Sequence, residues 1–194
     1  MNLAIIVAHP DDAEIWMGGT MLTYWEDKHN ISIIYPLEVS NERKKEAVMD
    51  KRWKTHFTND LFSDLLNINP DLVFTHWNND SHKEHREVFL MVNKVMPELV
   101  VSNLLVTRLF CFGSYNNLGL GGELFKPTDF IDISNHWDGK HQMIFNYKSQ
   151  KPELWVNMIK PINELWGNQC CVKYAEGFLE TPILGVMRRS RKIL

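Results

Sequence analysis

Apolar segments of strand length alternate with segments of helical character along most of this chain. Segments 3–8, 31–39, 69–77 and 103–113 are rich in Ile, Val, Leu and Phe, so both faces of each strand can be buried. Strands that are apolar on both faces are typical of parallel sheets covered by helices on both sides. With right-handed crossovers, this alternation predicts an α/β fold with a Rossmann-like, mostly parallel sheet and helices on both faces.

The segments between these strands predict the helices. A helix over 40–54 is expected to begin at Ser40 or Asn41, because short polar side chains cap helices and Glu42 follows in the first turn. Gly18 and Gly19 let the start of another helix pack closely. The remaining expected elements are helices at 17–28, 59–67, 82–96 and 138–150 and an edge strand at 125–134. No linker or repeat divides the 194 residues, which predicts one domain over 1–194.

Charge and hydropathy exclude several kinds of partner. The chain has 21 Lys and Arg against 24 Asp and Glu, a net charge of −3, and lacks the basic stripe that nucleic-acid binding requires. The basic segment 187–192 is interpreted as a solvated tail, with a phosphate contact as the alternative. No apolar run approaches the roughly 20 residues of a membrane span, and no signal peptide is recognisable. A homo-oligomer is left open.

The cysteines indicate the compartment. Cys111, Cys170 and Cys171 are odd in number and have neither the spacing of a zinc site nor that of a disulfide framework. Reduced thiols of this kind are typical of cytoplasmic proteins, so we expect a cytoplasmic location.

Two polar clusters directly follow two of the predicted strands. The first strand leads into the tetrapeptide 9–12, His-Pro-Asp-Asp, and the strand at 69–77 leads into "THWNNDSHKEH". In open α/β sheets, ligands bind at the carboxyl ends of the strands, so both clusters are expected at one edge of the sheet. His82 and His85 lie three residues apart on the first turn of a helix and share a face.

These clusters carry the donor types of a metal site. Two imidazoles and one carboxylate with a free coordination position suit a catalytic zinc ion, and a spare carboxylate at Asp11 would accept a proton from water. Taken separately, the clusters have simpler interpretations: the aspartate pair caps a helix, the two histidines are solvated, and the glycine pair binds a nucleotide. A carboxylate-rich loop repels phosphate, and the two clusters together favour a metal site. His76 follows a strand and could reach the site, but it is interpreted as a hydrogen-bonded loop histidine.

The same motifs resemble a known family. "AHPDDAEIWMGGT" and "THWNNDSHKEHREV" are similar to the two signatures of the PIG-L/LmbE-like deacetylases, which remove acetyl groups from N-acetylated amino sugars. Weaker similarities occur at "ERKKEA", "FKPTDFIDIS", "KHQMIFNYKSQ" and "YAEGF". The resemblance implies a metal, normally Zn²⁺, held by His9, Asp12 and His85. Mixed His/Asp sites of this kind also accept Fe²⁺, Mn²⁺ or Co²⁺.

The resemblance also implies roles for the neighbouring residues. Asp11 would be the general base, and His82 would stabilise the oxyanion or protonate the leaving amine. Arg43 would contact the substrate. Trp16 stands where the family has a small residue, and we expect it to offer a stacking face for a sugar ring at the mouth of the pocket.

Other departures from the family concern the second signature and the chain length. Lys83 replaces the usual proline, and Glu84 replaces the usual aspartate. The short segment between Arg43 and Pro70 leaves little room for the extra strand and loops that commonly shape the substrate pocket in the family. The glycine-rich loop 113–125 is expected near the pocket.

The sequence therefore predicts a metal-dependent hydrolase that releases acetate and a free amine from an N-acetylated amino sugar or sugar conjugate. Its pH profile should be bell-shaped, because the base must be ionised while a histidine acid stays protonated. The alternatives are a deacylase of another amide, such as a secondary-metabolite or antibiotic sugar, and a non-catalytic metal- or sugar-binding module. Asp11 argues against the binding module, because metal binding alone does not need it.

Overall fold

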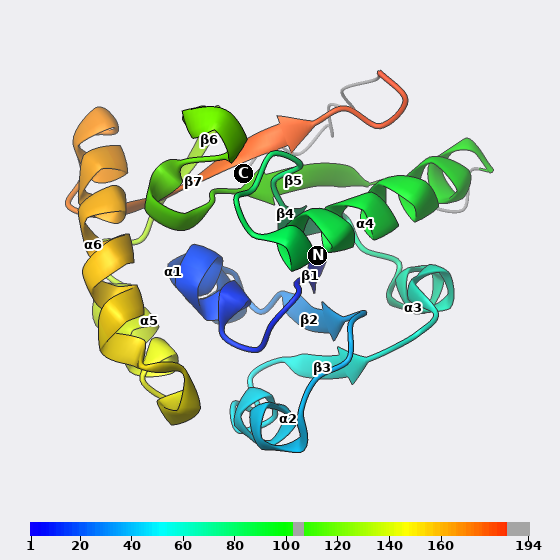
Figure 1. Ribbon diagram of the computed structural model, residues 1–194, viewed down its shortest axis with the longest axis horizontal. Coiled ribbons are helices and arrows are strands. Elements are labelled where there is room, and N and C mark those ends of the chain that lie inside the picture. The colour runs from blue at the N-terminus through cyan, green and yellow to red at the C-terminus, as the bar shows by residue number, and fades with distance from the viewer. Residues whose placement is uncertain (103–106, 186–194) are drawn as a thin grey trace.

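The computed structural model describes residues 1–102 and 107–185, so the basic segment 187–192 lies outside it (Figure 1). In this part of the chain, the strands form one sheet in the order β3-β2-β1-β4-β5-β7-β6. The strands are β1 (Asn2–Ile6), β2 (Asn30–Tyr35), β3 (Lys54–Phe57), β4 (Leu72–His76), β5 (Arg108–Phe112), β6 (Asp129–Asp132) and β7 (Ala175–Thr181). The α-helices are α1 (Asp12–Glu26), α2 (Asn41–Ala47), α3 (Leu61–Ile68), α4 (Lys83–Val101), α5 (Trp137–Ile144) and α6 (Pro152–Gln169).

The sheet is mostly parallel, as predicted. β1 pairs in parallel with β2 and β4, and the parallel set extends to β3 on one side and β5 on the other. β7 is antiparallel to β5 and to β6, which forms the edge of the sheet. The Rossmann-like α/β class is therefore confirmed, with β6 at the edge where a strand was expected.

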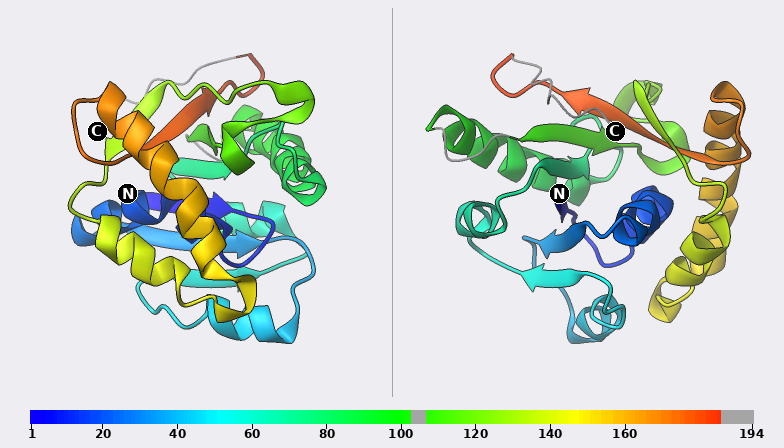
Figure 2. Two further views of the ribbon diagram at one scale, coloured as in Figure 1. Left: turned by 60° about the vertical axis from the view of Figure 1, so that its left-hand side comes forward. Right: turned by 180° about the vertical axis from the view of Figure 1, so that it is seen from behind.

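Helices cover both faces of the sheet. α1, α5 and α6 lie on one side, and α3 and α4 lie on the other (Figures 1 and 2). The strand β1 and the residue after it show why: Leu3, Ile5 and Val7 pack into the core beneath α1, while Ala4 and Ile6 pack into the core beneath α3 and α4. Alternate side chains of a strand point to opposite faces, so this strand is apolar throughout because both faces are buried.

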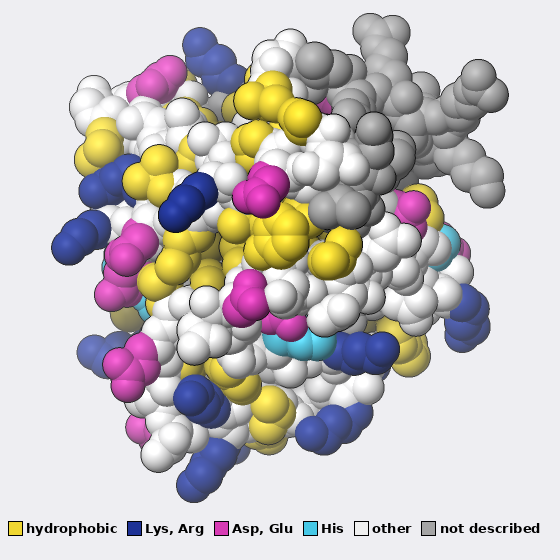
Figure 3. All heavy atoms as spheres, turned by 90° about the vertical axis from the view of Figure 1, so that its right-hand side faces the viewer, with side chains coloured by type: hydrophobic (Ala, Val, Ile, Leu, Met, Phe, Trp, Pro, Cys, Tyr) yellow, Lys and Arg dark blue, Asp and Glu magenta, His cyan; other side chains and the backbone are white. Residues whose placement is uncertain are grey.

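The surface over α3 and α4 mixes apolar and charged side chains (Figure 3). α4 exposes Leu90 there, while Val88 and Val92 on its other side are buried. None of the helices in residues 1–102 and 107–185 is long and apolar enough to cross a bilayer.

The segment after β2 differs from the sequence prediction. Ser40 caps α2 as expected, with its Oγ accepting a hydrogen bond from the Arg43 N–H at 3.4 Å. The helix ends at Ala47, however, and the chain then forms β3, so the helix over 40–54 was a wrong prediction and the short segment does have room for an extra strand. β3 pairs with β2, and Phe57 stacks on Tyr35 with ring centroids 5.2 Å apart. Such pairing with a distant strand is not visible in the local pattern.

The helix α1 begins earlier than predicted and is interrupted. It starts at Asp12, and Met17 has non-helical backbone angles (φ −143°, ψ 22°). The buried carboxylate of Glu176, on β7, accepts hydrogen bonds from the N–H groups of Gly19 and Thr20 at 3.0 and 2.7 Å. It therefore satisfies donors that the break would leave unpaired. A Cβ at Gly19 would come within 2.6 Å of Ile133, which confirms that a glycine permits close packing here.

The C-terminal elements extend beyond those predicted. α5 covers only part of 138–150, and α4 continues through Pro97 to Val101, beyond the predicted end at Met96. α6 and β7 have no counterpart among the predicted elements. α6 packs against α1 and α5 on the same side of the sheet (Figure 2).

A buried ion pair joins α5 to β7. The Lys140 Nζ lies 2.6 Å from Glu176 Oε1 and 3.0 Å from Asn163 Oδ1, and all three side chains are fully buried. Burial lowers the pKa of Lys140, and Glu176 only partly opposes this.

We expect Lys140→Met to destabilise the fold by about 3–5 kcal/mol, because it leaves the Glu176 charge buried without a cation. Urea denaturation measures the change. Lys160→Met is the control, because Lys160 pairs with Glu164 on the exposed side of α6, and its loss should change the stability little. Equal stability losses in the two variants would contradict the prediction.

Candidate functional site

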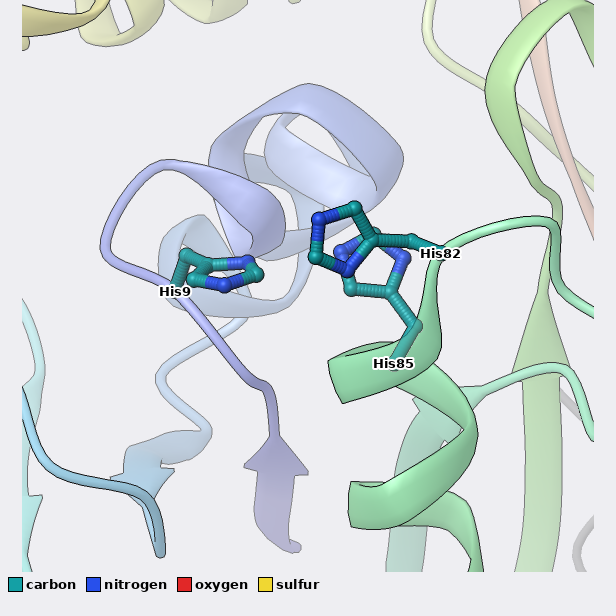
Figure 4. Close-up of side chains that lie close together, drawn as sticks. All are labelled: His9, His82 and His85. Carbon is teal, nitrogen blue, oxygen red and sulfur yellow. The ribbon is translucent and has the colours of Figure 1, made fainter.

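The two polar clusters meet at the carboxyl ends of β1 and β4. His9 lies between β1 and α1, and His82 and His85 lie at the start of α4. Their rings face one another in Figure 4, with centroids 5.0 Å apart for His9 and His82, and 5.4 Å apart for His9 and His85. The parallel register of β1 and β4 thus brings together residues far apart in the sequence.

Asp12 lies between two of these histidines. Its Oδ2 is 3.3 Å from His9 Nδ1, and its Oδ1 is 3.4 Å from His85 Nε2. The Oδ2 also accepts a hydrogen bond from the backbone N–H of His9 at 2.7 Å, which orients the carboxylate. Burial opposes ionisation, but His85 and His76 hold the pKa of Asp12 well below its usual range. The two histidines therefore favour the ionised form of this carboxylate.

Asp80 determines the orientation of His85. Its Oδ2 is 2.9 Å from His85 Nδ1, and its Oδ1 accepts a hydrogen bond from the backbone N–H of His82 at 2.7 Å. Burial lowers the pKa of His85, but Asp12 and Asp80 outweigh it and raise this pKa to about 10. The site therefore attracts positive charge, either a proton or a cation that replaces it.

The donor set fits a divalent metal. His85 Nε2 is buried and, within the described chain, has no hydrogen-bond partner, although it points at Asp12. A histidine that gives its other nitrogen to a carboxylate is typical of metal ligands. His9, Asp12 and His85 each bring a nitrogen or oxygen donor to this place, and such donors suit zinc. Asp12, His76 and His85 also offer one donor atom each within 4.8 Å of one another. One nitrogen from each of His9, His82 and His85 lies within 4.8 Å of the others.

His76 is the last residue of β4, and its Nε2 lies 3.4 Å from Asp12 Oδ2. Its Nε2 accepts a hydrogen bond from the Ala8 N–H at 2.9 Å, and its ring is fully buried against His85, with centroids 3.8 Å apart. Burial and His85 lower the pKa of His76 to about 4. The predicted hydrogen bond of His76 is present, but the residue belongs to β4 rather than to a loop and does reach the site.

Sequence reasoning assigned no role to Asp80, although it stands inside the second motif, five residues before His85. We expect Asp80→Asn to weaken metal binding by about 10–100-fold, because an amide cannot hold His85 in the same protonation state and orientation. Competition with a chelating dye measures the affinity. Asp64→Asn on α3 is the control, and equal affinities in the two variants would contradict the role of Asp80.

Asp11 has a strained backbone and a buried carboxylate. Its φ is 113°, in the region that favours glycine, and the side chain is 4% exposed. Burial and the neighbouring Asp12 raise the pKa of Asp11 well above its usual range, although Arg43 opposes them. Asp11 occupies the N-cap position of α1, but its carboxylate makes no capping hydrogen bond to the described backbone of the helix, so the interpretation of this side chain as a cap is wrong.

Arg43 holds the Asp11 carboxylate in place. Its Nη2 donates to Asp11 Oδ1 at 3.2 Å and to the carbonyl oxygen of Pro10 at 2.8 Å. The guanidinium borders the pocket, as a substrate contact must, but part of its hydrogen-bonding capacity is used within the protein.

A pocket of about 560 Å³ opens beside these groups. It lies at the carboxyl edge of the sheet, and the loop after β5, α6 and the 3₁₀ turn Lys148–Gln150 contribute to its wall. The loop 113–125 reaches the pocket, as predicted. The lining residues are His9, Asp11, Arg43, His82, Tyr115, Asn116, Gln150, Trp155 and Met158.

The structure contradicts the stacking role predicted for Trp16. This side chain is 1% exposed and packs against Phe112 and Tyr115, with ring centroids 6.5 and 6.0 Å away. Trp16 lies one helical turn after Asp12 and shares its buried face, because α1 begins within the motif. It belongs to the core and is absent from the described pocket lining.

Glu84 and Lys83, the two residues of the second motif that differ from the family pattern, lie in different surroundings. The half-exposed carboxylate of Glu84 contacts His9 Nε2, which leaves His9 Nδ1 facing Asp12. Lys83 is exposed on the first turn of α4 and does not line the pocket.

No family model matches the sequence. Several solved structures share its fold. A conserved protein from Thermus thermophilus is 21% identical, with a TM-score of 0.77 and 100% of both chains covered. The 4-carboxy-2-hydroxymuconate hydratase GalB from Pseudomonas putida is 16% identical, with the same TM-score and coverage. The N,N'-diacetylchitobiose deacetylase from Pyrococcus horikoshii is 20% identical, with a TM-score of 0.71, covering 94% of this chain and 84% of that one.

The fold is thus one that PIG-L/LmbE-like deacetylases adopt, as the two motifs implied. Because a hydratase has a similar fold, the reaction must be argued from the site itself.

Proposed function

We propose that this protein is a metal-dependent N-deacetylase acting on an N-acetylated amino sugar or sugar conjugate, with acetate and a free amine as products. The observation that supports this most strongly is the position of Asp11. Its carboxylate borders the pocket, is held by Arg43, makes no capping hydrogen bond to the described backbone of α1, and lies outside the proposed ligand set. A protein that only binds metal or sugar has no need for such a group.

His9, Asp12 and His85 would hold the metal. A divalent ion there supplies Lewis acidity, which polarises an amide carbonyl and acidifies water. The donor set favours Zn²⁺, although Fe²⁺, Mn²⁺ and Co²⁺ accept the same ligands. Glu84 contacts Nε2 of His9, and Asp80 contacts Nδ1 of His85. Both rings are therefore oriented before an ion binds.

Asp11 is the general base in this proposal. It accepts a proton from the attacking water, and its raised pKa makes it a stronger base than an ordinary aspartate. Arg43 keeps the carboxylate directed at the pocket through the 3.2 Å contact.

His82 borders the same pocket. Burial, His85 and His9 lower its pKa, so it readily gives up a proton when it carries one. In the proposal it faces the amide oxygen as negative charge develops there, or it returns a proton to the leaving amine.

An assay for release of free amine tests the proposal. The metal-loaded protein is incubated with a panel of N-acetyl amino sugars, antibiotic sugars and other acylated amides, and mass spectrometry follows the loss of the acyl group. A deacylase of another amide would act on a different member of the panel. A hydratase adds water without releasing an amine, and a binding module turns nothing over, so either result would contradict the proposal.

A further inference from the structure

We infer that Trp155, backed by Tyr115, forms the wall on which the ring of a sugar substrate stacks, so that the site selects cyclic acetamides over acyclic ones. This inference rests on the proposed deacetylase function and identifies the part of the substrate that the pocket recognises.

The position of Trp155 supports this inference first. It lies in the first turn of α6, and Met158, one turn later on the same face, also lines the pocket. The Trp155 side chain is only partly buried, in contrast to the fully enclosed Trp16. The indole therefore presents apolar surface to the space beside His82 and Asp11.

Tyr115 connects this wall to the reacting groups. Its ring centroid lies 5.5 Å from that of Trp155, at an interplanar angle of 31°. The same ring is 5.5 Å from His85 and 6.1 Å from His82. A sugar ring stacked on Trp155 and Tyr115 would therefore lie next to His82 and His85.

The wall is rigid because the core supports it. Tyr115 packs edge-on against Trp16, whose ring stacks on Phe112 of β5 at an interplanar angle of 6°. Trp16 and Phe112 are almost completely buried, so the surrounding core restricts movement of their rings. A preformed surface loses little conformational freedom on binding, which favours affinity.

The chemistry around the wall matches a neutral pyranose. A sugar ring has an apolar face of C–H groups and an edge of hydroxyls. The described lining combines aromatic and thioether surface with the amides of Asn116 and Gln150, and the charge of Arg43 is already balanced by Asp11. A volume of about 560 Å³ lies within the range of small-molecule sites.

Two acetamide probes test the inference: the methyl glycoside of N-acetylglucosamine, which has a ring, and N-acetylethanolamine, which has none. We expect Trp155→Ala to raise KM for the glycoside about 5–20-fold with little change in kcat, because stacking acts equally in the ground and transition states. KM for the acyclic probe should not change, and Trp155→Phe should restore most of the affinity. Leu154→Ala is the control, since Leu154 is 58% exposed and does not line the pocket.

Binding of the glycoside, measured by saturation-transfer NMR, provides a readout independent of turnover and should be weaker in Trp155→Ala. Retained binding, or an equal rise in KM for both probes, would overturn the stacking inference while the deacetylase stands. Absence of amine release from every acetamide by the unaltered, metal-loaded protein would overturn the proposed function instead.

Discussion

Asp11→Asn is expected to lower kcat by about 10²–10⁴-fold, the usual contribution of a positioned general base, while the protein keeps its fold and its metal. Asparagine has the size of aspartate and tolerates the left-handed backbone conformation observed at φ 113°. Its amide oxygen can still accept the Arg43 hydrogen bond. It cannot accept a proton at neutral pH, so only the chemical step should suffer.

Three measurements are needed for Asp11→Asn: the kinetics, the metal content and the unfolding midpoint. Asp138→Asn is the matched control, because Asp138 is exposed in the first turn of α5 and is absent from the described lining of the pocket. A variant that retains its metal and turns substrate over at a near-normal rate would remove Asp11 from the mechanism.

His85→Ala is expected to lose bound metal and activity together, with turnover falling to background. His85 contributes the buried Nε2 that faces Asp12, and alanine has no donor to replace it. His9→Ala and Asp12→Ala should behave in the same way, because three ligands are the usual protein share of a catalytic zinc site. Elemental analysis of the purified proteins measures the loss.

His29→Ala controls for a general effect of removing a histidine. His29 follows α1 and lies beside the N-terminal amine, with its Nδ1 3.0 Å from the Met1 nitrogen. It should lose neither metal nor activity. A full equivalent of metal in His85→Ala would show that the ligand set is wrong. His9→Ala is the safer second test, because His9 is not fully enclosed, whereas removing His85 leaves the buried Asp80 carboxylate without its partner.

The sequence was sufficient to predict the parallel sheet and the meeting of the two motifs. Continuous apolar segments such as that of β1 indicate strands buried on both faces, whatever their neighbours are. In a parallel sheet, the residues that follow the strands lie at one edge, so His9 and His85 had to come close. These conclusions depend on local composition and general rules of topology, and both can be read along the chain.

Local pattern was not sufficient where pairing with another element decides the conformation. The segment after Ala47 reads as helix, yet Lys54–Phe57 forms a strand because β2 offers an open edge. Asp80 was overlooked for a similar reason. Its role depends on a contact with His85 Nδ1, which the residue spacing does not reveal.

The positions of two tryptophans show most clearly what depends on the tertiary structure. Trp16 stands inside a motif, and Trp155 stands in a helix that no motif marks, yet the first is enclosed in the core and the second lines the pocket. The sequence by itself indicated the buried parallel strands β1, β2, β4 and β5, and it indicated the candidate metal ligands and the candidate base because they follow strand ends. Only the tertiary structure decided which tryptophan faces the pocket, because that depends on how α6 and the loop after β5 pack across the edge of the sheet.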